Sequence, residues 1–495
     1  MTRPSPPSAR PGIAGHFARY ASGNLLSLVA GFVSFPITTR LLSAEQFGVL
    51  GYWEVWVLLC VAIAKLGAGD AMMRFHPHGQ DEAAMRRYAA SLVYAPFLLG
   101  GGLWLLMMLA TSAASVAGWI DTPLIAELAM ATVLVSAWTS HVNWLLATRE
   151  FSGLNTLSNV GSRWLTVLAT LAVLWWWWRD AAGVYAARLA VGAGVLCFLL
   201  VWLRRHVPLD RRAFDPALLR EGLSYGVPLA LREIANIVLV LINRLMLKWF
   251  DAGYAAIGIY TIGFSLATYL EQLLSAALGQ AINPVATRLY ATQGAAAVKA
   301  LKARVLPPIL YAACGAGAGL VIAGADFVTL VASADKVAAA PVFVIAGLSF
   351  LLQAVISVAG MGLLLEKRSA RLFALTAMAA LVTITANAWA IPRFGLMGAV
   401  VSTSGSQLLL QIGIWLSCSP ALRCLPPWRP TLIGLGLAGL CVLVAGSTHL
   451  FGVVGTLPRL AVAVALLSGL YLLPLLALDR SWLVWWRARR AGGTR

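Results

Sequence analysis

The sequence predicts an all-α polytopic membrane protein with about 14 transmembrane helices. Of its 495 residues, 60% are apolar and 11% are charged, whereas an average soluble domain carries roughly 25% charged residues. Apolar runs of about 20 residues, the length that crosses a hydrocarbon core about 30 Å thick, follow one another along the chain. Short polar turns separate them. This pattern excludes a soluble enzyme.

Apolar runs bounded by charge, glycine or proline define the candidate spans in order. The first six lie near 21–41, 46–66, 89–111, 123–147, 156–178 and 183–203. The next six lie near 222–242, 255–279, 304–324, 338–362, 371–391 and 396–418. The last two lie near 431–450 and 458–478, and leaving out this pair gives the alternative count of twelve. We expect the longest turns, 67–88, 204–221 and 287–303, to be loops.

The basic residues predict the orientation in the membrane. With the N-terminus in the cytoplasm, 27 of the 37 lysines and arginines fall in cytoplasmic segments, as expected because cytoplasmic loops of membrane proteins are rich in both. We therefore expect both termini in the cytoplasm. The same excess explains the net charge of +18 without nucleic acid as a partner.

A short repeat predicts two related halves. Thr39-Arg40-Leu41 ends span 1 and Phe47-Gly48 opens span 2, while Asn243-Arg244-Leu245 ends span 7 and Ile257-Gly258 opens span 8. The copies lie six spans apart and share one orientation, as in transporters built from two similar bundles. We expect two six-helix bundles in a pseudo-twofold arrangement plus two extra C-terminal helices. The boundaries are a tail 1–20, bundles 21–203 and 222–418 with a cytoplasmic linker 204–221, added helices 431–478 and a basic tail 479–495.

Polar residues inside the spans are candidates for a substrate path, because an ionised side chain at the centre of a membrane helix costs about 2.5–3.5 kcal/mol on insertion scales. The candidates are Arg232, Glu233, Asn236, Asn243 and Arg244 in span 7, Glu271 in span 8, Asn24 in span 1, Arg163 in span 5, and Arg40 at the end of span 1. Two structural alternatives stay open. Small and hydroxylated residues also line ordinary helix contacts in membranes, and Arg232 and Glu233 could form an ion pair with another helix.

Catalytic and metal-binding patterns are absent from the sequence. It contains no Walker A motif, no cluster of cysteine and histidine at ligand spacing, and no nucleophile with a plausible base. We therefore expect no catalytic residue, no metal and no cofactor. Coupling to H⁺ or Na⁺ is a hypothesis that rests on Glu233 or Glu271, either of which could titrate or pair with Arg232.

Two segments resemble the polysaccharide flippases of the MOP superfamily, the Wzx-type O-antigen transporters. Residues 24–51 (NLLSLVAGFVSFPITTRLLSAEQFGVLG) contain the Pro-Ile-x-x-Arg-Leu-Leu, Glu and Phe-Gly elements in the expected order. Residues 225–260 contain Gly226-Val227-Pro228, then Asn243-Arg244-Leu245, then Gly258-Ile259-Tyr260. Asn243 stands where the family typically has Asp, which weakens a role for a charge at that point.

The resemblance implies transport of an oligosaccharide linked to undecaprenyl pyrophosphate. The glycan would move from the cytoplasmic to the periplasmic leaflet of a bacterial inner membrane by alternating access, for cell-surface polysaccharide such as lipopolysaccharide. Arg232, with Arg163 and Arg40, would offset the phosphate charge, since guanidinium geometry suits phosphate. The partners implied are the glycan, membrane lipid, and the polymerase and chain-length proteins of the same pathway.

Two other functions stay open. A MATE-like drug or cation antiporter would have twelve spans, so the extra pair and the arginines speak against it. A membrane glycosyltransferase or polymerase of lipid-linked glycans would need an acidic catalytic site and usually a sizeable outer loop. The chain has no such loop. Its nearest acidic candidate, Glu45 in the first outer turn, is better interpreted as the start of a helix.

Overall fold

The structure is a computed structural model that describes residues 13–77, 82–148, 152–207, 209–366, 368–447 and 453–478. Within these ranges, side chains are described except at 13–25, 152, 274–281 and 369. All regular elements in these ranges are helical, so the predicted all-α class is confirmed. The predicted tail 479–495 and most of the tail 1–20 lie outside the described residues.

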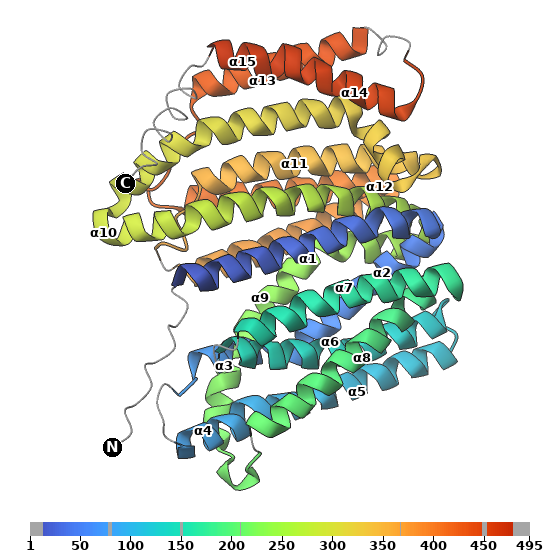
Figure 1. Cartoon of the computed structure of the whole chain (residues 1–495), viewed down its shortest axis with the longest axis vertical. Coiled ribbons are helices and arrows are strands. Elements are labelled where there is room, and N and C mark those ends of the chain that lie inside the picture. Colours follow the sequence, from blue (N-terminus) through green and yellow to red (C-terminus); the bar gives the residue numbers. More distant parts are fainter. Residues whose placement is uncertain are drawn as a thin grey trace, which may run out of the picture. The chain divides into compact units, whose positions relative to one another are not determined.

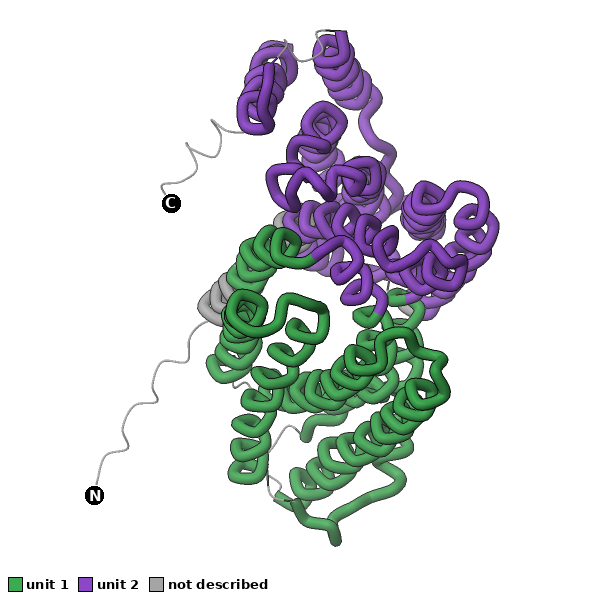
Figure 2. Tube along the Cα trace, turned by 90° about the vertical axis from the view of Figure 1, so that its right-hand side faces the viewer, with its two compact units in different colours: residues 1–42, 53–237 green, residues 43–52, 238–495 purple. Residues whose placement is uncertain are grey.

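The chain forms two compact units, which Figure 2 shows in different colours. Unit 1 comprises Met1–Leu42 and Trp53–Ile237, and unit 2 comprises Ser43–Tyr52 and Val238–Arg495. The boundaries fall inside two helices, α2 (Ala44–Lys65) and α9 (Pro216–Trp249). Each of these helices therefore contributes to both units.

Unit 1 is an antiparallel set of long apolar helices joined by short turns (Figure 1). Helix α6 packs against α5 and α8, and α7 packs against α8 and α1. Besides α2 and α9, its elements are α1 (Ile13–Leu41), α3 (Ala68–Arg74), α4 (Glu82–Tyr88), the π-helix η1 (Ala89–Tyr94), α5 (Ala95–Val116), α6 (Pro123–Thr148), α7 (Ser152–Trp176), α8 (Ala181–His206) and the 3₁₀-helix η2 (Arg211–Ala213).

Unit 2 is organised around α10, which packs against α11, α13 and α14, while α11 also packs against α12. Its elements are α10 (Gly253–Ala332), η3 (Ala334–Ala339), α11 (Ala340–Ala359), α12 (Ser369–Ser417), α13 (Trp428–Ser447), α14 (Thr456–Leu466), the π-helix η5 (Leu467–Leu472) and α15 (Leu473–Leu478). The two added C-terminal helices that the sequence predicts correspond to α13 and to the continuous segment 456–478.

Twelve helices of the described chain are long and apolar enough to cross a membrane. The apolar part of α1, Leu26–Leu41, falls below the length criterion for these twelve. Helix α12 counts once, although its 49 residues contain a non-helical break at Gly395, and at 1.5 Å per residue they are more than twice the thickness of a hydrocarbon core of about 30 Å. Adding α1 and dividing α12 at Gly395 gives the predicted fourteen.

The three predicted loops are wrong in part. Residues 287–303 are helical, because α10 continues through a kink at Gly294, whose φ of 78° interrupts the helical geometry. Segment 67–88 contains α3 and α4, and the predicted linker 204–221 contains η2 and the first turn of α9. Polar helices that continue a membrane helix carry no hydropathy signal, so a search for apolar runs misses them.

A reciprocal glycine contact joins the two copies of the sequence repeat within unit 2. A Cβ added to Gly48 would lie 1.7 Å from the carbonyl oxygen of Tyr254, and one added to Gly258 would lie 1.7 Å from that of Ala44. Each glycine thus meets the residue four positions before the other glycine. The starts of α2 and α10 therefore cross with their backbones in contact, and small residues permit this close approach of membrane helices.

Gly258→Ala is expected to destabilise the purified protein by about 1–3 kcal/mol, because overpacking against backbone cannot be relieved by a rotamer change. Thermal unfolding in detergent measures the effect. Gly439→Ala is the matched control, since a Cβ at this helical glycine meets nothing within 4 Å. Equal melting temperatures for the two variants would contradict the contact.

Candidate functional site

A close contact between two glycines positions the ionisable residues of unit 1. Helix α2 ends at Lys65, and Leu66 and Gly67 then adopt positive φ values of 52° and 66° before α3 begins. A Cβ on Gly67 would lie 1.9 Å from the carbonyl oxygen of Gly226 in α9. Glycine at both positions therefore lets the turn after α2 lie directly on the backbone of α9.

Four ionisable residues, which we name the charged cluster, gather beside this contact: Lys65, Asp70, Arg232 and Glu233. The Lys65 ammonium donates to Glu233 Oε1 at 2.6 Å. Asp70, in the first turn of α3, lies within electrostatic range of Arg232, Glu233 and Lys65. The Arg232 guanidinium has no hydrogen-bond or ion-pair partner among the described residues. The cluster is neutral overall, with one cation bound to a carboxylate and the other available.

The α9 residues of the charged cluster are exposed at the middle of a 34-residue apolar helix. Arg232, Glu233 and Asn236 all have exposed side chains. Pro228, one turn before Arg232, lies inside the same helix and removes one backbone hydrogen bond there. The predicted cross-helix ion pair therefore exists for Glu233, with Lys65 as its partner, while Arg232 and Asn236 keep their polar groups accessible.

Asn143 of α6 forms an amide ladder with Asn155 and Asn159 of α7, which was not predicted from the sequence. Asn159 Nδ2 donates to Asn155 Oδ1 at 2.8 Å, and Asn143 Nδ2 donates to Asn159 Oδ1 at 3.2 Å. Arg163 follows Asn159 by one helical turn and is exposed, as is Asn159. The spacing of 155, 159 and 163 places these residues on one helix face. This spacing in the sequence could have identified the polar face of α7.

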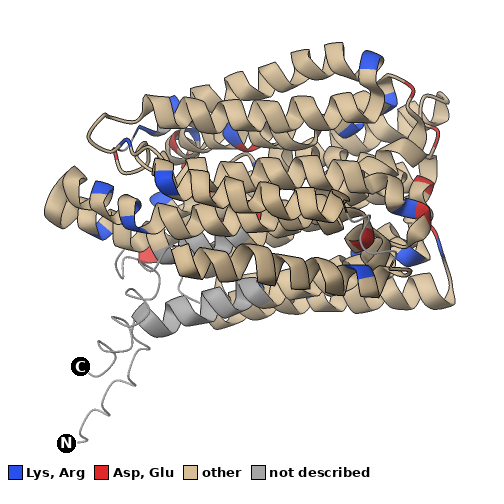
Figure 3. Cartoon of the chain, turned by 90° about the horizontal axis from the view of Figure 1, so that it is seen from above, with Lys and Arg blue, Asp and Glu red and all other residues tan. Residues whose placement is uncertain are grey.

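A second ion pair was also missed. Arg188 Nη1 of α8 donates to Glu54 Oε2 of α2 at 2.6 Å. Arg188 lies in the second turn of α8. Helix α2 therefore carries two ion pairs, one to α8 and one to α9. Other charged residues concentrate towards helix ends and turns, as Figure 3 shows.

Asn243 and Arg244 are buried in unit 2. Asn243 is 0% exposed and donates to Tyr260 Oη and, at 2.9 Å, to Thr403 Oγ1, joining α9 to α10 and α12. Arg244 is 6% exposed, and its Nη1 lies 3.5 Å from the carbonyl oxygen of Gly51. In this conformation both side chains are buried and join helices of unit 2. Their contact with a substrate stays a prediction.

Two further predicted residues lie on other helices. Glu271 of α10 is half-buried and Arg40, at the end of α1, is exposed. The side chain of Asn24 lies outside the described part of the chain. The structure thus brings together Arg232 and Glu233, with Asn236 one turn away on the same helix. It adds Lys65 and Asp70, which the sequence analysis had not placed there.

Comparison with known proteins decides the family. The family model described as polysaccharide biosynthesis protein matches residues 16–290, more than half of the chain. The chain belongs to the polysaccharide biosynthesis protein family. This result confirms the predicted membership, and no curated protein matches the chain.

Solved structures show that this member of the polysaccharide biosynthesis protein family has the fold of MOP-superfamily transporters. A lipid II flippase MurJ in an inward closed conformation has a TM-score of 0.71 at 10% identity, covering 94% of this chain and 99% of that one. An inward-facing multidrug resistance MATE family transporter of the MOP superfamily has a TM-score of 0.61 at 13% identity, covering 86% and 99%. An outward-facing MATE structure has a TM-score of 0.51 at 13% identity, covering 88% and 97%. The protein is a multi-pass membrane protein whose structural neighbours are transporters.

Proposed function

We propose that the protein translocates a lipid-linked oligosaccharide, carried on a polyisoprenyl diphosphate such as undecaprenyl pyrophosphate, from the cytoplasmic to the periplasmic leaflet. Membership of a polysaccharide biosynthesis family and the fold of a lipid II flippase support this class of substrate. Alternating access of two helix bundles would carry the head group, and the lipid tail would stay in the bilayer. The cell-surface polysaccharide would be assembled from the translocated glycan.

The exposed Arg232 in the middle of α9 carries the proposal. A guanidinium exposed to hydrocarbon is costly, so membrane proteins point such groups into water-filled cavities. Arg232 has no ion-pair partner in the described chain, which leaves its planar donors available for a phosphate. Asn236, one turn further, and the amide ladder of Asn143, Asn155 and Asn159 offer the hydrogen bonds that sugar hydroxyls lose on leaving water.

The ion pair of Lys65 with Glu233 suggests how an ion could be coupled to transport. Protonation of Glu233 would release the Lys65 ammonium and change the charged cluster from neutral to a net charge of +1. A diphosphate would then meet two available cations. Glu233→Gln mimics the protonated state, so we expect this variant to transport without dependence on an imposed proton gradient.

Flipping measured with and without the gradient tests this expectation. Glu271→Gln is the comparison variant, because Glu271 is the other acidic residue to which the sequence hypothesis assigned coupling. Unchanged gradient dependence in Glu233→Gln would contradict a coupling role for Glu233. The same experiment with a Na⁺ gradient separates the two ions.

Removal of the gene tests the proposed function in the cell. We expect the lipid-linked glycan to accumulate on the cytoplasmic face of the inner membrane and the surface polysaccharide to be lost. Resistance to cationic drugs on overexpression, with the glycan unaffected by deletion, would favour the antiporter instead. The similarity to a MATE transporter over 86% of the chain supports testing that alternative.

A further inference from the structure

We propose that the segment from Arg204 to Arg220 and the first half of α9 together bind an anionic phospholipid. We name residues 204–207 and 209–220 the basic linker. It carries five arginines against two aspartates, and the arginines are all exposed. Within the described part of the chain none of them makes an ion pair. They are Arg204, Arg205, Arg211, Arg212 and Arg220.

The basic linker is held in place by the π-helix η1. Tyr94 Oη donates to the carbonyl oxygen of Val207 at 2.6 Å, and Ser91 Oγ accepts from the backbone N–H of Asp215 at 2.8 Å. The two aspartate carboxylates accept hydrogen bonds from the backbone. Asp210 Oδ1 accepts from the N–H of Arg212, and Asp215 Oδ1 accepts from that of Ala217. The arginines are thus presented on a fixed segment whose carboxylates bind backbone N–H groups.

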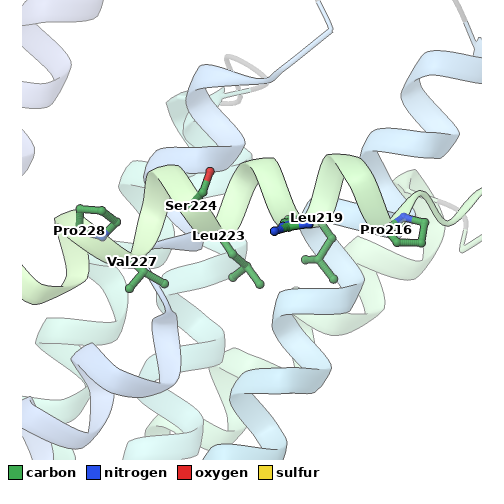
Figure 4. A pocket seen from close by; sticks show the side chains of 7 residues that line it. Pro216, Leu219, Leu223, Ser224, Val227 and Pro228 are labelled. Carbon is green, nitrogen blue, oxygen red and sulfur yellow. The ribbon is translucent and has the colours of Figure 1, made fainter.

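An apolar hollow of about 530 Å³ lies along the first half of α9, which continues the basic linker. Its lining residues lie on one face of the helix, as Figure 4 shows. They are Pro216, Leu219, Arg220, Leu223, Ser224, Val227 and Pro228. The face extends over twelve residue steps, or about 18 Å at 1.5 Å per residue. That length is close to the depth of one leaflet, half of a hydrocarbon core of about 30 Å.

The arginines and the apolar hollow together indicate an anionic lipid as the ligand. Of the residues that the structure describes, Arg220 is the one ionisable residue that lines the hollow, and it lies near the end where the basic linker joins α9. Exposed Leu209 (47%) and Phe214 (44%) lie among the arginines, a combination typical of segments in the membrane interface. Arginines near the surface of a membrane attract anionic lipids. A phospholipid with a hydrocarbon chain in the hollow and its phosphate at Arg220 matches both the apolar hollow and the exposed arginines.

The occupant is a phospholipid rather than the proposed glycan carrier. A glycan head would need several hydrogen-bonding groups, and among the described residues Ser224 is the only one that lines the hollow with a hydroxyl. Its hydroxyl already donates to the carbonyl oxygen of Glu221 at 2.8 Å. An acidic protein partner would leave the apolar hollow unexplained. The structure therefore favours a lipid with a small anionic head, such as phosphatidylglycerol.

Lipid binding to the purified full-length protein tests the proposal without transport. Phosphatidylglycerol and phosphatidylcholine are titrated separately, and bound lipid is counted by native mass spectrometry. Arg211→Gln, Arg212→Gln and Arg220→Gln are combined in one variant. Because each basic residue near a membrane surface contributes about fivefold in affinity, we expect about a hundredfold weaker binding of phosphatidylglycerol and a much smaller change for phosphatidylcholine, whose net charge is zero. Val227→Asp, which places a charge in the hollow, is expected to weaken both.

The matched control combines Arg288→Gln, Arg393→Gln and Arg429→Gln, three exposed arginines outside the basic linker, and should retain binding. Arg220→Lys keeps the charge and should also retain binding. Binding of phosphatidylcholine by the first triple variant shows that this variant is folded. Equal affinity for the two lipids, or equal loss in both triple variants, would overturn the proposal. Binding of an isoprenyl diphosphate at this surface in place of phosphatidylglycerol would also overturn it. None of these outcomes depends on whether the protein flips a glycan.

Discussion

Arg232→Ala is expected to abolish transport of the lipid-linked glycan, whereas Arg232→Lys should retain part of it. The guanidinium is exposed at the middle of α9 and lacks an ion-pair partner among the described residues. Alanine removes both the charge and the paired donors. Lysine keeps a positive charge but loses the planar arrangement that binds two phosphate oxygens at once.

The size of the Arg232 effect follows from charge-assisted hydrogen bonds. Such a bond contributes about 1.5–3 kcal/mol, so losing two of them corresponds to a decrease in the transport rate of at least a hundredfold. Initial rates of flipping in proteoliposomes measure it. Arg393→Ala is the control, because Arg393 is also exposed but stacks on Trp389 in α12. Wild-type flipping by Arg232→Ala would remove this residue from the mechanism.

Lys302→Met is expected to cost at least about 3 kcal/mol in the free energy of unfolding, the largest loss of stability that we predict. Lys302 is 1% exposed. Its ammonium donates to the carbonyl oxygens of Ala359 at 3.1 Å and Leu422 at 2.7 Å, and to that of Met361. This contact ties α10 to the end of α11 and to the turn after α12. Methionine fills similar space but removes the Lys302 donor from three carbonyl groups.

Denaturation of the purified protein in detergent measures the effect of Lys302→Met. Lys299→Met is the matched control, because Lys299 lies one turn earlier on α10 and is exposed. We expect little change for Lys299→Met. If both variants unfold at the wild-type denaturant concentration, the three carbonyl contacts do not stabilise unit 2.

Hydropathy predicted the helices of this protein better than it predicted their partners. Most apolar runs appear as helices within a few residues of the expected bounds, because about 20 apolar residues are needed to cross a bilayer whatever the helix contacts. The errors concern polar helices such as 287–303, where no apolar run marks the element. The kink at Gly294 likewise could not be predicted from hydropathy.

The helix that carries the candidate site could be predicted from the sequence, but the residues that contact it could not. The spacing of Arg232 and Asn236 identified a polar face of α9, since helical periodicity places residues four apart on one side. Glu233, by contrast, pairs with Lys65, which is 168 positions away in sequence. Asn243 carries the same polar signal as Asn236 yet is fully buried. Only the packing of α9 against α10 and α12 separates a buried amide from an accessible one.

Reconstitution of the purified protein with a fluorescent polyisoprenyl diphosphate glycan measures the proposed function most directly. The labelled lipid is placed in both leaflets of sealed vesicles, and a membrane-impermeant quencher reports the fraction that reaches the outside. We expect quenching to rise from about half of the label towards completeness with wild-type protein and to stay near half with Arg232→Ala. Quenching that stays near half with folded wild-type protein, under proton and Na⁺ gradients alike, would contradict the assignment of this chain as a flippase.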